Sequence, residues 1–172
     1  LYRSGDPGVD TIEQFLEKGL TQGGVIGFDG RTTGVNTGKR YAAIAAGKQG
    51  KVSCQSDLVG KIWKERPSLP GEKVFLLDEK YSGESTASKL QRVREKMKEA
   101  SADVHLLASL DDIAWLLNLR GNDIAYCPLF LSYLLVYEDH AELFADEKKF
   151  PDDVLKELKK NHILLKPYNN IY

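Results

Sequence analysis

The stretch SLDDIAWLLNLRGNDIAYCPLFLSY, residues 109–133, carries the pattern that decides the fold. Ser109, followed three residues later by an aspartate, is typical of a helix N-terminus, and it predicts a short helix with Ile113 and Trp115 facing the core. An irregular polar loop follows this helix. Residues 129–137 then predict the most apolar strand of the chain. The stretch therefore predicts a loop whose two ends are held by core elements.

The sequence around this stretch alternates between strand and helix patterns. Downstream of a polar turn that ends at Gly83, apolar residues recur at helical spacing, and the turn at residues 138–140 predicts a hairpin. The expected strands are 74–77, 103–108, 129–137, 141–145 and 162–165, and the expected helices are 86–100, 109–117 and 151–160. This order predicts an α/β fold, with a mixed β-sheet flanked by helices.

A second α/β stretch precedes it. Asp10 with Glu13 predicts the start of a short helix, and the chain continues with expected strands at 25–28 and 51–54, an expected helix at 35–46, and a helix that begins at Ser56 or Asp57. The segment Arg66-Pro-Ser-Leu-Pro-Gly71 then stops regular structure. We therefore predict a domain boundary there, with residues 1–70 and 74–172 belonging to different domains.

Composition excludes several classes of function. The chain has 172 residues, is 42% hydrophobic and 28% charged, and carries a formal net charge of −1. Its charges are mixed along the sequence, which disfavours nucleic acid and anionic membranes as partners. The two cysteines, Cys54 and Cys127, lie far apart, and we expect buried or half-buried free thiols. The chain starts at Leu1 without an initiator methionine, so we expect it to be part of a longer protein.

No self-contained active site is predicted. The glycines between Gly23 and Gly38 do not have the spacing of a phosphate-binding loop, and turn glycines explain them. None of the three histidines, His105, His140 and His162, has a second ligand at the spacing of a metal pair. We expect each of them to be structural or solvated.

The polar loop 118–128 is the strongest candidate for binding. Its candidate residues are Arg120, Asn122, Asp123 and Tyr126. A loop that is held at both ends by core elements is how a scaffold presents binding residues. The alternative is a loop whose polar side chains only form hydrogen bonds with the loop's own backbone. The residues alone leave both interpretations open.

The quoted stretch strongly resembles the signature of the three-domain Xaa-Pro aminopeptidases (aminopeptidase P). Three further matches occur in order along the chain, at 25–29, 62–67 and 78–85. One departure is Cys127, where the family usually has asparagine. The metal ligands of the family, two aspartates, a histidine and two glutamates from a later catalytic domain, have no counterpart in these residues.

The resemblance implies that residues 1–70 are the C-terminal part of a first creatinase/prolidase N-terminal-like domain, and that 74–172 are most of a second. We also hypothesise that the two stretches pack as one permuted unit. The longer protein is then expected to be a cytoplasmic homodimer whose catalytic domain holds two divalent ions, manganese or zinc, and hydrolyses the bond before proline. The fragment itself is expected to hold no cofactor and to be inactive, with proline-containing peptides and its own catalytic domain as partners.

The same resemblance suggests that Arg120 and Asp123 line the entrance for substrate, with Asn122 and Tyr126 beside them. Alternatively, Arg120 and Asp123 pair with each other or bind neighbouring backbone. A rival function is a non-enzymatic peptide- or protein-binding module of the same fold, as in a histone-chaperone subunit. Creatine amidinohydrolase shares the domain type but lacks the signature, and is the weakest alternative.

Overall fold

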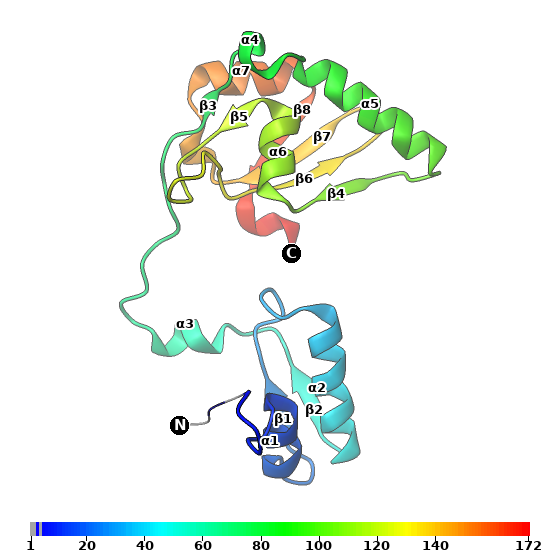
Figure 1. The fold of residues 1–172 in the computed structure, drawn as a ribbon, viewed down its shortest axis with the longest axis vertical. Coiled ribbons are helices and arrows are strands. Elements are labelled where there is room, and N and C mark those ends of the chain that lie inside the picture. The colour runs from blue at the N-terminus through cyan, green and yellow to red at the C-terminus, as the bar shows by residue number, and fades with distance from the viewer. Residues whose placement is uncertain (1–2, 4) are drawn as a thin grey trace. The chain divides into compact units, whose positions relative to one another are not determined.

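The computed structural model describes residue 3 and residues 5–172, which form two compact units, Leu1–Pro67 and Ser68–Tyr172 (Figure 1). The division between the units falls in the segment Arg66–Gly71. Its two prolines remove backbone N–H donors and disfavour helix at the residues before them, so regular structure stops there. Each unit is described below by itself.

The first unit is a small βαβ arrangement with two further helices. Its elements are α1 (Ile12–Gly19), β1 (Val25–Gly27), α2 (Val35–Gly47), β2 (Lys51–Ser53) and α3 (Leu58–Ile62). Strands β1 and β2 pair in parallel, which requires a crossover connection, and α2 provides it. Ile26 of β1 and Ala45 of α2 are the buried apolar residues of this unit among those described.

The start of α1 differs by one residue from the prediction. Thr11, rather than Asp10, is the N-cap, because its hydroxyl accepts from the Gln14 backbone N–H and the Gln14 side chain accepts from the Thr11 N–H. Asp10 instead accepts a hydrogen bond from Lys18 Nζ at 2.6 Å. A threonine–glutamine capping box satisfies two free N–H groups at once, which the aspartate one position earlier does not do here.

The second unit is a mixed β-sheet flanked by helices, which confirms the predicted fold class. Its four-stranded sheet has the order β4-β6-β7-β8, in which β7 and β8 are parallel and the other pairs antiparallel. A separate antiparallel pair joins β3 to β5. The elements are β3 (Phe75–Leu76), α4 (Glu79–Ser82), α5 (Thr86–Glu99), β4 (His105–Leu107), α6 (Leu110–Leu117), β5 (Leu119–Arg120), β6 (Tyr133–Val136), β7 (Ala141–Ala145), the 3-10 turn η1 (Glu147–Lys149), α7 (Asp152–Lys160), β8 (Ile163–Pro167) and the 3-10 turn η2 (Tyr168–Ile171).

Strand β6 begins at Tyr133, four residues later than predicted. The backbone before it is bonded elsewhere: the Leu129 carbonyl accepts from the Asp123 N–H at 3.0 Å, and the Leu131 N–H donates to the Asp123 carboxylate at 2.6 Å. The polar loop therefore takes the hydrogen bonds that a longer strand would need. The sequence predicts a strand from residue 129 only because residues 129–131 are apolar.

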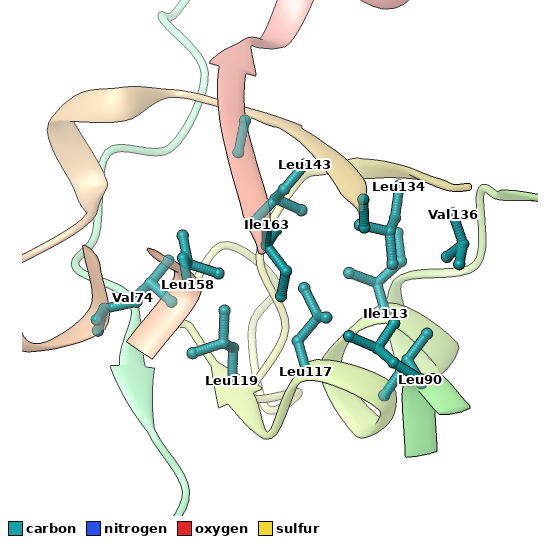
Figure 2. Close-up of a cluster of buried hydrophobic side chains, with 14 of the residues drawn as sticks. Val74, Leu90, Ile113, Leu117, Leu119, Leu134, Val136, Leu143, Leu158 and Ile163 are labelled. Atoms are coloured by element: carbon teal, nitrogen blue, oxygen red, sulfur yellow. The ribbon is translucent and has the colours of Figure 1, made fainter. Parts of the chain in front are cut away.

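The core of the second unit joins the sheet to three helices (Figure 2). Leu90 of α5, Ile113 of α6 and Leu158 of α7 contact the same cluster as Leu134 of β6 and Leu143 of β7. Burying one such side chain contributes about 1.5 to 3 kcal/mol. This cluster fixes the positions of the elements on either side of the polar loop.

Two expected side-chain environments are wrong. Trp115 is 46% exposed, because the buried face of α6 is formed by Ile113, Leu116 and Leu117 at helical spacing, and Trp115 lies on another face. Cys54 and Cys127 are free, as expected, but both are exposed rather than buried. Over the described part of the chain, no helix is long and apolar enough to cross a membrane.

Candidate functional site

The candidate site is the loop of residues 121–128, which we call the signature loop. Strand β5 leads into it and β6 follows it, so core elements hold both ends. The Gly121 N–H donates to the Pro128 carbonyl at 3.1 Å, and the Cys127 N–H donates to the Ile124 carbonyl at 3.1 Å. These bonds close the loop on itself and give it a defined shape.

Gly121 is required where the two ends of the signature loop meet. A Cβ at this position would lie 2.7 Å from Phe130 Cβ and 3.1 Å from the Leu129 carbonyl oxygen. Real Cβ atoms do not approach other carbons so closely, and Phe130 is itself buried. Glycine therefore allows the close approach of the two chain segments that the loop needs.

Asp123 anchors the signature loop from inside. Its side chain is 0% exposed, and its Oδ2 atom accepts hydrogen bonds from the Leu131 N–H and from Lys149 Nζ. The Lys149 side chain is only 2% exposed, and its backbone carbonyl accepts from the Val74 N–H at 2.8 Å. A buried ion pair with an added backbone hydrogen bond ties the loop to η1 and to the start of β3.

Arg120 also binds backbone. Its Nη1 atom donates to the carbonyls of Ala114, at 2.7 Å, and Leu119, at 2.8 Å. Among the residues that the structure describes, Arg120 forms no ion pair with a carboxylate, so it does not pair with Asp123. The side chain is half-buried, and its Nη2 and Nε atoms make no hydrogen bond within the described chain.

Asn122 and Tyr126 point the other way. Both are exposed, and Tyr126 is fully so. Tyr126 also has a φ of 63°, in the left-handed region that a non-glycine residue rarely adopts. The structure therefore brings the four predicted residues into one short segment, with Arg120 and Asp123 turned inward and Asn122 and Tyr126 outward. Their role in substrate binding stays a prediction.

Lys149 is the residue of this arrangement that the sequence did not reveal. It lies between Lys148 and Phe150 in a charged turn, where a solvated lysine is the ordinary expectation. Its partner Asp123 is 26 residues away, and no local pattern connects them. Only the folded arrangement brings the two charges together.

A second buried lysine supports the helix that precedes the signature loop. Lys89 Nζ donates to the Trp115 carbonyl at 2.6 Å and to Asn118 Oδ1 at 2.7 Å, and Asn118 Nδ2 donates to the Glu84 carbonyl at 2.8 Å. Burial lowers the pKa of Lys89, which the nearby Glu84 partly opposes. Asn118, with a φ of 52°, ends α6 in the left-handed conformation and turns the chain into β5.

The described residues include no group of three or more histidines, cysteines, aspartates or glutamates that could hold a metal ion. The chemistry that the signature loop and the adjoining Arg120 offer is recognition: an exposed amide, an exposed phenol ring and the unused N–H groups of a half-buried guanidinium. These groups can bind peptide carbonyls, apolar rings and carboxylates.

The fold and the anchored loop define an α/β domain of the creatinase/prolidase N-terminal type. The Creatinase/Prolidase N-terminal domain family matches residues 65–172, so the chain belongs to this family. Within it, the chain is similar along its whole length to Xaa-Pro aminopeptidases. It is 35% identical to Xaa-Pro aminopeptidase app-1 of Caenorhabditis elegans, covering 100% of this chain and 28% of that protein. It is also 35% identical to aminopeptidase P2 of Arabidopsis thaliana, covering 99% of this chain and 24% of that protein.

A solved structure shows the same relationship. The crystal structure of the X-prolyl aminopeptidase from Caenorhabditis elegans, described as a cytosolic enzyme with a di-nuclear active site, has a TM-score of 0.85 at 33% identity. The match covers 100% of this chain and 28% of that one. The chain thus spans about a quarter of the length of the relatives it matches.

Proposed function

We propose that this chain is the non-catalytic N-terminal and middle region of a metal-dependent Xaa-Pro aminopeptidase, and that it shapes the access of peptides to the catalytic domain. The family membership and the similarity to Xaa-Pro aminopeptidases along the whole chain support the lineage. The longer protein is proposed to be a cytoplasmic homodimer. It would remove an N-terminal residue that precedes proline.

The observation that carries the role in substrate access is the signature loop. Its base is fixed by the buried Asp123–Lys149 pair, whereas Asn122 and Tyr126 are presented to solvent. Because the base of the loop is rigid, less conformational entropy is lost when a ligand binds, so exposed groups on this loop are suited to recognition. A loop that served only its own backbone would not need to expose a tyrosine in a left-handed conformation.

Each residue of the site then has a proposed task. The Asn122 amide would bind a carbonyl or N–H of the peptide backbone, and the Tyr126 ring would lie against a proline or another apolar side chain. The free N–H groups of Arg120 would meet a peptide carboxylate. Asp123 acts through the loop that it anchors.

The metal chemistry belongs to the proposed catalytic domain outside these residues. Two divalent ions there, manganese or zinc, would activate a water molecule and polarise the carbonyl before proline. The residues of this chain would orient the peptide and limit its size.

The first test uses kinetics of the longer protein with Xaa-Pro peptides of two and of six residues. Tyr126→Ala and Asn122→Ala should raise KM by about three- to tenfold for the longer peptide, and leave kcat within about twofold, if they bind remote parts of the substrate. Arg120→Ala should change kinetics as well, and it should also lower thermal stability somewhat, because it removes the hydrogen bonds to the Ala114 and Leu119 carbonyls. Unchanged kinetics with a large loss of stability would assign these residues to the fold alone.

The second test addresses the rival function and the inactivity of the fragment. The sequence downstream of residue 172 in the longer protein should supply the five ligands of a metal pair, whereas a binding module would lack them. The 172-residue chain, incubated with Mn²⁺ or Zn²⁺ and a Gly-Pro peptide, should release no glycine. Chelator-sensitive hydrolysis by this chain would contradict the proposal.

A further inference from the structure

A hollow of about 490 Å³ lies between α5, α6 and the start of β4, away from the signature loop. The residues that matter in its lining are Lys89, Arg92, Lys96, Met97, His105 and Trp115. Figure 1 shows α5 and α6 beside β4 in the second unit. The half-exposed Trp115 is the largest apolar group that the hollow presents.

The charges of the lining favour an anion. Lys89, Arg92 and Lys96 are positive, and Glu95 is the acidic residue of the lining. Arg92 pairs with Glu84 and Lys96 with Glu99, each at 2.6 Å, but the side chains of these two cations are 60% and 78% exposed. Exposed ion pairs contribute little to stability, so a carboxylate of a ligand can replace these partners at little cost.

Lys89 adds a positive charge that no carboxylate neutralises directly. It is 1% exposed, and its ammonium donates to two neutral oxygens, the Trp115 carbonyl and Asn118 Oδ1. Among the described residues, no carboxylate lies within ion-pair distance of Lys89. Because a charge in a low-dielectric interior is weakly screened, its field reaches the adjoining hollow and favours an anion there.

The indole ring of Trp115 disfavours a cationic ligand. Lys89 Nζ lies 4.5 Å from the centroid of the Trp115 ring, and Arg92 Cζ lies 5.9 Å from it. The negative face of the ring is therefore already engaged by cations, and a further cation would be repelled. Val93 and Met97 of α5 complete an apolar floor beside the ring.

We propose that this hollow binds an acidic peptide segment of a partner protein, with a ligand carboxylate between Arg92 and Lys96 and an apolar ligand side chain against Trp115. The hollow is larger and more apolar than an inorganic anion needs. The positive charge of its lining disfavours a basic peptide. Tryptophan and arginine are the residues that most often dominate peptide and protein interfaces. This proposal is independent of the role of the signature loop.

The test is an NMR titration of the 172-residue chain. The chain has two tryptophans, Trp63 in the first unit and Trp115 in the second, so the indole N–H region contains an internal reference. Trp115→Phe assigns the two signals. The acetylated and amidated peptide Glu-Glu-Leu-Phe should shift the Trp115 signal saturably at concentrations of up to about 2 mM, while Trp63 stays in place. The neutral peptide Gln-Gln-Leu-Phe should bind at least about fivefold more weakly.

Charge variants complete the test. Arg92→Gln combined with Lys96→Gln should lower the affinity of the chain for the acidic peptide at least about fivefold. The matched control, Lys98→Gln combined with Lys80→Gln, removes the same charge outside the hollow and should leave the affinity unchanged. Any one of four results would overturn the proposal: no shift of the Trp115 signal, binding of the neutral peptide as tight as that of the acidic one, a loss of affinity in the control variant as large as in Arg92→Gln/Lys96→Gln, or a shift with inorganic phosphate as large as with the peptide.

Discussion

Asp123 shows how a residue that is conspicuous in the sequence can have an unexpected position in the fold. The sequence leaves Asp123 either at a substrate entrance, or paired with Arg120 or bonded to neighbouring backbone. Its side chain is fully buried, where it accepts from the Leu131 N–H and pairs with Lys149, a partner that the sequence does not indicate. Its Oδ1 atom is buried as well and accepts no hydrogen bond within the described residues. A carboxylate in this environment depends on its partners, because an unpaired buried charge is costly.

Removing either partner of this pair should destabilise the second unit. We expect Asp123→Ala and Lys149→Met each to lower the free energy of unfolding by about 3 to 5 kcal/mol, because each leaves an uncompensated buried charge. Urea unfolding, followed by the fluorescence of Trp115 in a Trp63→Phe background, measures the effect. Asp139→Ala is the control: its side chain is 85% exposed, so the substitution should lower the free energy of unfolding far less.

The double variant makes this prediction sharper. The double variant Asp123→Ala/Lys149→Met leaves no buried charge without a partner. Its loss of unfolding free energy should therefore be smaller than the sum of the losses in the two single variants. Additive losses would show that the two charges do not stabilise each other. In that case the loop would be held by its backbone hydrogen bonds alone.

The sequence predicts where the signature loop begins and ends but not which of its side chains turn inward. Asn118, Gly121 and Pro128 mark the limits of the loop through local backbone preferences, which a single sequence expresses well. Which side chains turn inward depends on Lys149, and on Phe130 packed against Gly121. Those contacts are set by tertiary structure, so Arg120 and Asp123 could not be distinguished in advance from Asn122 and Tyr126.

At the scale of elements, helix starts were more predictable than strand limits. Ser109 caps α6 as expected, because a serine hydroxyl bonds an N–H only three residues away, and α5 starts at the expected residue 86 with Ser85 as its cap. The start of β6 depends on hydrogen bonds between the signature loop and residues 129 and 131, and it was predicted four residues too early. A pattern of apolar residues cannot reveal which partner a backbone group will bond.

The N-cap of α6 should contribute measurably to stability. Ser109→Ala removes the acceptor for the Asp112 N–H and should lower the free energy of unfolding by about 0.5 to 2 kcal/mol. Ser109→Asp should retain most of the stability, since a carboxylate also accepts this bond and favours a helix N-terminus. Ser68→Ala, in a segment without regular structure, is the matched control; an equal loss there would contradict a capping role.

At the scale of the whole molecule, the division into two compact units is the main structural fact. The assignment of residues 1–70 and 74–172 to two creatinase/prolidase N-terminal-like domains stays a prediction, and so does their packing as one permuted unit. Mixed sheet and helices could be predicted from periodicity because the second unit has a coherent apolar core. The first unit has few buried residues, so its sequence constrains packing less.

The first unit should be sensitive to acid. Hydrogen bonds from Arg31 lower the pKa of Asp29, and hydrogen bonds from the Gly60 N–H and Arg66 lower the pKa of Asp57. A carboxyl whose folded pKa is lowered stabilises the fold above its unfolded pKa, and that stability is lost as the pH falls through the folded value. The thermal midpoint of the first unit should therefore fall below about pH 4.

Trp63 fluorescence in a Trp115→Phe background follows this transition. Asp57→Asn combined with Asp29→Asn should lower the midpoint at pH 7 and flatten its decline between pH 5 and pH 3, since fewer groups then take up protons on unfolding. A decline as steep as in the unchanged chain would place the acid sensitivity in other groups.

The parallel pairing of β7 with β8 has a consequence for the order of events during synthesis. The strand that completes the sheet, Ile163–Pro167, is translated after α7, and it pairs with Ala141–Ala145, which leaves the ribosome earlier. Until Ile163 emerges, the nascent chain presents one unpaired edge of β7 and an uncovered apolar surface. A ribosome that pauses after β7 has emerged, while residues 163–167 are still inside the exit tunnel, would therefore expose a segment that chaperones bind.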